Sequence, residues 1–206
     1  SSNQTCIAIL ITHHHYDHTG GVDALYANDP RINIYGPDNL PIKSPYFSIQ
    51  SEVNIAGNHF KVLYIPGHTL DHIAYYDGKH LFVGDTLFSG GCGRVFEGSN
   101  EQMLKSLDII CTFPDETIVF CAHEYTLNNL KFALFVEPDN LDIKRHMEIV
   151  AQKTISLPTS IALEKKINPF LRLNEPNIQA NLQSKSYDTN TRLNTFSALR
   201  KLKDEF

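Results

Sequence analysis

Four potential metal ligands stand within six residues of this chain, directly after an apolar run typical of a buried strand. The apolar run is Cys6 to Ile11, and the segment after it reads Thr12-His13-His14-His15-Tyr16-Asp17-His18. A chain that leaves a sheet near Thr12 can aim alternate side chains at one point. His13 and His15 can then share one divalent ion, and Asp17 and His18 suit a second. A solvated His-rich loop is disfavoured, because the segment lies inside the chain between a strand and the turn at 19–21.

Three later apolar runs each lead to one further residue of a ligand type. Residues 60–65 precede Pro66-Gly67-His68, residues 81–83 precede Gly84-Asp85, and residues 117–121 precede Ala122-His123. One such residue alone is weak evidence for a site. Three at strand ends are stronger evidence, because ligands at one edge of a sheet converge in space.

The pattern His-x-His-x-Asp-His, followed by a lone His, Asp and His, resembles the metallo-β-lactamase superfamily. The resemblance implies an α+β fold, a four-layer αββα sandwich with a dinuclear site at the sheet edge and a C-terminal helical domain. By motif, one metal takes His13, His15 and His68, the other takes Asp17, His18 and His123, and Asp85 bridges them.

Segments around these residues resemble glyoxalase II, the hydroxyacylglutathione hydrolase family. They are Pro66-Gly67-His68-Thr69-Leu70-Asp71-His72, Gly84 to Phe88, Gly91 to Gly98, Cys121 to Thr126 and Asn168 to Arg172. The resemblance implies hydrolysis of S-D-lactoylglutathione to D-lactate and glutathione in methylglyoxal detoxification. A hydroxide on two divalent ions, zinc first, with iron or manganese as alternatives, would be the nucleophile. Asp17 and Asp85 are the predicted catalytic carboxylates.

A glutathione thioester carries two carboxylates, so cationic contacts are expected. The resemblance assigns substrate contacts to Arg94, Phe96, Tyr125, Arg200 and Lys203. Phe stands at 96 where some relatives have Tyr, so a hydroxyl contact is replaced by apolar packing. Leu193, Phe196, Leu199 and Leu202 predict an amphipathic helix over 191–206, with Arg200 and Lys203 on one face. An ordinary solvated basic face near a helix C-terminus is the alternative.

The chain divides into two expected domains: residues 1–126 as the metal-binding catalytic domain and 127–206 as the helical substrate-binding domain. Further strands are expected at 32–35, 52–55 and 73–76, the last in a hairpin through Asp77-Gly78. Helices are expected after Gly20-Gly21, over 101–110, and at two stripes on either side of Pro138. The resembling family places a β-rich segment ahead of the motif, so the N-terminal part is expected to be incomplete, with an uncovered sheet edge.

Several residues near the motifs receive structural interpretations. His14 is expected to point away from the metals by strand-like alternation. His72 is interpreted as a residue that orients a ligand. Cys92 is interpreted as structural, since a metal hydroxide already supplies the nucleophile.

Composition restricts the partners. The net charge is −5 with no basic cluster, which argues against nucleic acid. No apolar run approaches the roughly 20 residues needed to cross a bilayer. The four cysteines lack C-x-x-C spacing, which favours reduced thiols in the cytoplasm, or in the mitochondrial matrix or another organelle if an upstream targeting segment is missing. We expect a monomer with a small-molecule partner.

Two alternatives remain at this point. A persulfide dioxygenase shares the His-x-His-x-Asp-His run but uses one iron and consumes oxygen. An inactive remnant would bind metal or a glutathione-like ligand and leave the thioester intact.

Overall fold

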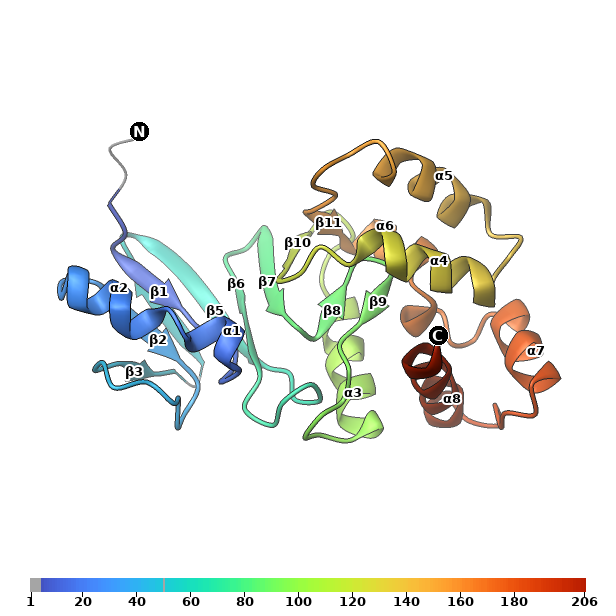
Figure 1. Ribbon diagram of the computed structural model, residues 1–206, viewed down its shortest axis with the longest axis horizontal. Helices are drawn as coiled ribbons and strands as arrows, with labels where there is room; N and C mark the ends of the chain where they lie inside the picture. Colours follow the sequence, from blue (N-terminus) through green and yellow to red (C-terminus); the bar gives the residue numbers. More distant parts are fainter. Residues whose placement is uncertain (1–4, 50) are drawn as a thin grey trace.

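The computed structural model describes residues 5–49 and 51–206. The first four residues of the expected N-terminal domain therefore lie outside the described residues. The N-terminal half is mostly β and the C-terminal half is helical (Figure 1).

A six-stranded mixed sheet forms the centre of the molecule, in the order β11-β10-β7-β6-β5-β4. Its strands are β4 (Glu52–Ile55), β5 (Asn58–Tyr64), β6 (Ile73–Tyr76), β7 (His80–Gly84), β10 (Ile118–Cys121) and β11 (Thr159–Ser160). The strand β10 runs parallel to β7, with a register shift after Phe120 where the chain turns toward His123. All five strands predicted for this region are present, including the 77–78 hairpin.

A smaller parallel sheet packs against the first one. It consists of β1 (Ala8–Leu10), β2 (Asn33–Gly36) and β3 (Phe47–Ser48), in that order. Leu10 and Tyr35 of this sheet pack on Val53, Val62 and Tyr75 of the large sheet, so an apolar layer separates the two. Among the described residues, β1 pairs with β2 on one side and with no strand on the other.

Helices cover both outer faces. On the small sheet lie α1 (Tyr16–Thr19) and α2 (Val22–Asn28), and Val22 packs on Ile11 and Ile34 (Figure 1). On the large sheet lies α3 (Asn100–Cys111), whose Met103 and Leu107 join Leu81 and Val119 in the main core. The layers are therefore helix, sheet, sheet, helix, as the αββα prediction requires.

The chain after Cys121 forms the C-terminal helices. They are α4 (Thr126–Val136), α5 (Leu141–Val150), α6 (Ile161–Ile167), a 3-10 turn η1 (Pro169–Leu171), α7 (Pro176–Ser184) and α8 (Arg192–Glu205). A short hairpin of β8 (Leu87–Phe88) and β9 (Gly91–Cys92) contacts α4 and η1. Phe170 and Phe196 are fully buried in the main core, so these helices share one core with the large sheet. Among the described residues, none of the helices combines the length and the apolar character needed to cross a bilayer.

Candidate metal centre

The predicted ligands meet at one edge of the sandwich because each follows the end of a strand. The 12–18 segment leaves β1, and its backbone is held to β6 by hydrogen bonds from the Ile73 amide to the Thr12 carbonyl (2.8 Å) and from the Tyr75 hydroxyl to the Ile11 carbonyl (2.6 Å). His68 follows β5, Asp85 follows β7 and His123 follows β10. Both sheets therefore contribute ligands to the same edge.

Among the described residues, four overlapping groups of three potential ligands lie at this edge, and two of them match the predicted sets. Ligand atoms of His13, His15 and His68 lie within 4.8 Å of one another, as do those of Asp17, His18 and His123. These are the two sets that the motifs predict. His13 is fully buried, His68 is 5% exposed, and the Asp17 side chain is 58% exposed, so the second group is the more open to solvent.

Asp85 lies between the two groups. One carboxylate oxygen is 3.2 Å from His18 Nε2, and the other is 3.2 Å from His123 Nε2 and 3.6 Å from His68 Nε2. Its side chain is only 8% exposed. A buried carboxylate within reach of histidines from both groups has the geometry of a bridging ligand.

The donor atoms fit divalent ions. His13 Nε2 is buried without a hydrogen-bond partner, and His68 Nε2 lies 3.1 Å from His15 Nδ1, so two imidazole nitrogens face each other. A buried polar atom without a partner is costly, and a metal ion satisfies such nitrogens. Borderline divalent ions are well suited to a set of imidazoles and carboxylates.

The surroundings of His13, His68 and Asp85 shift their pKa values in the direction that metal binding needs, whereas the hydrogen bond to Asp85 outweighs burial and raises the pKa of His18. Desolvation, together with His72, His18 and other nearby histidines, holds the pKa of His13 far below its usual value. Desolvation also lowers the pKa of His68. Although burial opposes it, the hydrogen bond and charge of His18 hold the pKa of Asp85 below its usual value. At neutral pH His13, His68 and Asp85 therefore present lone pairs rather than protons.

Two glycines allow the close approach of the ligand loops. Gly84 has φ +50, and a Cβ there would lie 2.8 Å from the His72 ring and 2.7 Å from Thr12 Oγ1. A Cβ on Gly93 would lie 1.9 Å from the Asp85 carbonyl oxygen. Side chains at either position would displace Asp85 or the loop beside it.

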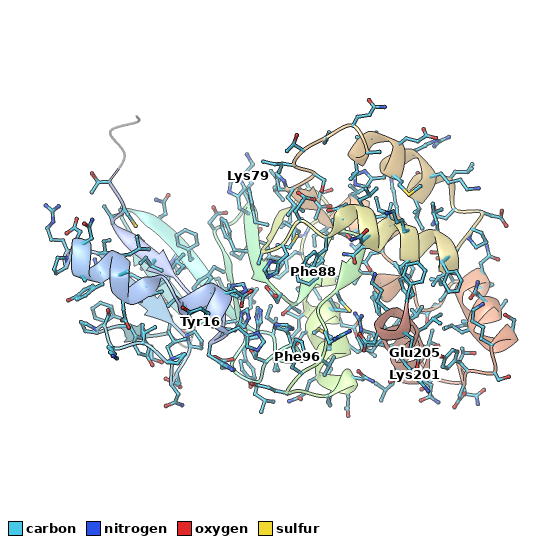
Figure 2. All side chains as sticks on the ribbon, viewed as in Figure 1. Tyr16, Lys79, Phe88, Phe96, Lys201 and Glu205 are labelled. Atoms are coloured by element: carbon cyan, nitrogen blue, oxygen red, sulfur yellow. The ribbon has the colours of Figure 1, made fainter. Side chains whose placement is uncertain are left out.

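A cavity of about 650 Å³ opens in front of the ligands. His15, Asp17, His68, Asp85 and His123 line it together with Phe88, Arg94, Phe96 and Tyr125. Figure 2 shows Phe88 and Phe96 near the middle of the molecule, between the N-terminal sheet and the C-terminal helices. A second cavity, of about 440 Å³, is lined mainly by apolar residues of both sheets and lacks this cluster of ligands.

The predicted substrate contacts divide into two sets. Arg94, Phe96 and Tyr125 line the large cavity, and Tyr125 stacks on His123 with ring centroids 5.0 Å apart. Arg200 is 7% exposed and donates to the Cys92 carbonyl at 3.0 Å and to Asp204 at 2.9 Å. It does not line that cavity. Neither does Lys203, which lies 5.1 Å from the Phe132 ring centroid.

Asp204 connects these two sets. Its Oδ1 accepts from Arg200 and also from Arg94 Nε at 3.2 Å. The helix α8 is therefore tied through Asp204 to the loop that borders the metal cavity. Sequence reasoning did not single out Asp204, although it follows directly after Lys203.

Residues behind the ligands behave as interpreted from the sequence. The ring of His72 is fully buried, and its Nε2 accepts from the Asp85 backbone amide at 3.0 Å. His14 points to Asp71 and Glu97. Cys92 is buried beside Arg200, and the four cysteines are free thiols.

Sequence reasoning missed Glu164, a fully buried carboxylate of α6. It accepts hydrogen bonds from Ser89, Gly90, Thr159 and Asn168 and so fixes the β8–β9 turn. Nothing in its local sequence, Leu163-Glu164-Lys165-Lys166, distinguishes it from a solvated helical glutamate.

Comparison with known proteins places the chain in the families that its motifs resemble. Residues 3–123 match the metallo-beta-lactamase superfamily, and residues 124–206 match the family described as the hydroxyacylglutathione hydrolase C-terminus. The hydroxyacylglutathione hydrolase of Photobacterium profundum is 47% identical over 208 residues, which cover 98% of this chain and 82% of that protein.

Solved structures share the fold. ETHE1 from Myxococcus xanthus is 26% identical with a TM-score of 0.65, over 97% of this chain and 71% of that one. TTHA1623 in a di-iron-bound form is 25% identical with a TM-score of 0.59, over 83% of this chain and 80% of that one.

Proposed function

The chain belongs to the hydroxyacylglutathione hydrolases of the metallo-β-lactamase superfamily, and from this premise we propose how its residues cleave a glutathione thioester. The reaction adds water to the thioester of a 2-hydroxyacyl glutathione and releases the hydroxy acid and glutathione. We propose S-D-lactoylglutathione as the substrate and D-lactate as the acid. The observation that carries the proposal is the meeting of the two ligand groups at Asp85, on the floor of a cavity bordered by Arg94 and Tyr125.

The fold and the donor set imply divalent metal binding. We propose two ions, zinc first, with iron or manganese as alternatives. His13, His15 and His68 would hold one and Asp17, His18 and His123 the other, with Asp85 shared. Such ions, when bound, lower the pKa of water to about 7 and polarise a carbonyl oxygen.

The two aspartates would act differently because their surroundings differ. Asp85 is buried among histidines, which suits a fixed bridging position. Asp17 is the exposed member, with Oδ2 3.3 Å from His123 Nε2 and 3.5 Å from His18 Nε2. We propose that its free oxygen orients the attacking water toward the thioester carbon.

The substrate is recognised by groups in two positions. Arg94 is half exposed at the rim of the cavity, where its charge can meet a carboxylate of glutathione. Phe96 is 60% exposed and lies beside His15 and His68, so it offers an apolar surface next to the reacting end. Tyr125 can contact the substrate from the His123 side.

Arg200 and Lys203 remain proposed substrate contacts. Arg200 is linked to the cavity through Asp204 and Arg94 rather than by lining it, and Lys203 lies over the Phe132 ring. We propose a division by role into a catalytic part over 1–126 and a mainly helical substrate-binding part over 127–206, although the two parts share one core and β11 of the second part belongs to the large sheet. We further propose that the protein acts as a cytoplasmic monomer, which a mass measurement in solution tests.

The decisive experiment combines thioester hydrolysis with elemental analysis. The wild type should consume S-D-lactoylglutathione, release thiol and contain two metal ions per chain. Asp85→Ala should lose metal and at least about 100-fold in rate, because the shared ligand is gone. Oxygen consumption with one iron per chain would support a dioxygenase, and an intact thioester in the fully metallated protein would refute the hydrolase. Asp85→Ala with unchanged metal content and rate would contradict the bridging assignment.

A further inference from the structure

His14 stands between two metal ligands in the sequence, yet its ring is turned away from them. Its Nδ1 lies 2.9 Å from Asp71 Oδ1, and its Nε2 lies 3.1 Å from Glu97 Oε1. Both ring nitrogens therefore face carboxylates that belong to other loops. His14, His15 and Glu97 also lie within 4.8 Å of one another, but the two carboxylates already occupy both nitrogens of His14.

The two carboxylates belong to the loops that carry the other ligands and the cavity rim. Asp71 lies three residues after the ligand His68 and directly before His72, whose ring accepts from the Asp85 amide. Glu97 follows Phe96, and its second oxygen accepts from the Leu70 amide at 3.0 Å. The His14 ring thus contacts both loops at once, through a hydrogen bond with Asp71 and a close approach to the Glu97 carboxylate.

These two loops are already joined to each other by a backbone hydrogen bond and by a contact of the His68 ring. The Gly98 amide donates to the Gly67 carbonyl at 3.2 Å, and the His68 ring contacts the Arg94 carbonyl at 2.8 Å. The 12–18 segment lies outside this pair of loops. Through its contacts with Asp71 and Glu97, the His14 ring fixes the backbone between His13 and His15 relative to His68.

We infer that His14 is a positioning residue that aligns His13 and His15 with His68 through its contacts with Asp71 and Glu97. The inference rests on the proposed metal assignment and adds a prediction to it. Only the ion held by His13, His15 and His68 should depend strongly on His14. The ion held by Asp17, His18 and His123 should depend on it much less, because the contacts of the His14 ring are with Asp71, Glu97 and the His15 ring and not with these three residues.

The test is a zinc titration of the metal-free protein against a chromophoric chelator, for the wild type and His14→Ala. The wild type should show two tight dissociation constants. In His14→Ala one constant should rise by about 10 to 100-fold, the range known for residues that orient metal ligands, and the other should change by less than about threefold. His14→Gln keeps one amide donor and should fall between the two.

His80→Ala is the matched control. His80 makes a comparable contact with Asp77 at 2.9 Å, and its side chain is 33% exposed against 32% for His14, but it begins β7 at the end opposite to Asp85. Its two zinc constants should equal those of the wild type.

Two results would overturn the inference. Unchanged constants in His14→Ala would show that the ring does not position the ligands. Equal weakening of both constants, with a lower melting temperature of the metal-free protein, would show a general structural role. Cobalt absorption of each variant adds a readout of ligand geometry that a general loss of stability does not move. The titration needs no turnover, so inactivity of the wild type toward the thioester would count against the proposed function alone.

Discussion

His72 is a buried side chain that contacts the backbone of the proposed ligand Asp85 without being a proposed ligand itself. Desolvation, with the nearby charge of His68, lowers its pKa to about 3, so the ring is neutral at any physiological pH. A neutral ring can accept the Asp85 amide on Nε2 and stack on His13, with centroids 4.6 Å apart. The tautomer and orientation of His72 are therefore set by the backbone that delivers Asp85.

The lowered pKa of His72 predicts a pH dependence of stability. In the unfolded chain the ring takes a proton near pH 6.5, whereas in the folded protein it takes one only near pH 3. The unfolded state therefore binds more protons as the pH falls below about 6.5, and the stabilisation present above that pH is progressively lost. Below pH 6 the loss should approach about 1.4 kcal/mol per pH unit.

Urea unfolding of the metal-free protein at pH 7.5, 6.5 and 5.5 measures this contribution. His72→Gln keeps an acceptor for the Asp85 amide but does not titrate, so its free energy of unfolding should fall less steeply. His59→Gln, a change at an exposed histidine, should keep the wild-type slope. Parallel curves for wild type and His72→Gln would contradict the assignment.

At the scale of elements, the β8–β9 hairpin owes its position to α6. Glu164 of α6 receives the Ser89 hydroxyl at 2.8 Å and the Gly90 amide at 2.8 Å. The hairpin carries Phe88, whose ring packs on His123 and Tyr125. A buried carboxylate in the helical half thus places an aromatic wall of the metal cavity.

Replacement of Glu164 should destabilise the protein strongly. Glu164→Ala leaves the Ser89 and Thr159 hydroxyls and the Gly90 amide without this acceptor in the core, and each unsatisfied group costs about 1–3 kcal/mol. We expect a loss of at least about 3 kcal/mol in the free energy of unfolding, measured in urea. Glu116→Ala, at an exposed site, should change it by less than about 0.5 kcal/mol. Equal stability of the two variants would refute this role.

The helix α8 shows what periodicity can and cannot predict. The expected range 191–206 agrees with the observed Arg192–Glu205, with Thr191 capping the N-terminus through the Asn194 amide. The burial of Arg200, a cation of this helix, was not predictable from the periodicity. Arg200 lies one turn after the fully buried Phe196, so it faces the core and meets the Cys92 carbonyl, a partner 108 positions away in the sequence.

At the scale of the whole molecule, the sequence predicts the candidate ligands better than the long-range contacts that hold them in place. Ligands that follow strands converge because strand ends share an edge, so His68, Asp85 and His123 could be placed from local patterns. The contacts that support them join residues such as Glu164 and Ser89, which are 75 positions apart. Such pairs leave no local pattern, since each partner alone is an ordinary polar residue.

Removal of metal should loosen the contact between the two sheets. Of the proposed ligands, His13, His15, Asp17 and His18 follow a strand of the small sheet, and His68, Asp85 and His123 follow strands of the large sheet. Each ion that binds only the folded state, at a hundredfold excess over its dissociation constant, stabilises it by about 2.7 kcal/mol. Hydrogen exchange of the chelator-treated protein should therefore accelerate in β1 and β2 more than in β7, and zinc should restore the slow exchange. Acceleration spread evenly over both sheets would contradict the expectation.

The placement of Asp17, His18 and their neighbours on one layer and Asp85 on the other has an evolutionary consequence. We expect a mutation in the interlayer packing around Tyr75 to alter the spacing of the proposed ligands without replacing any of them, because the Tyr75 hydroxyl donates to the Ile11 carbonyl, two residues before His13. We therefore expect natural selection to act on substitutions in this apolar layer through catalysis as well as through folding.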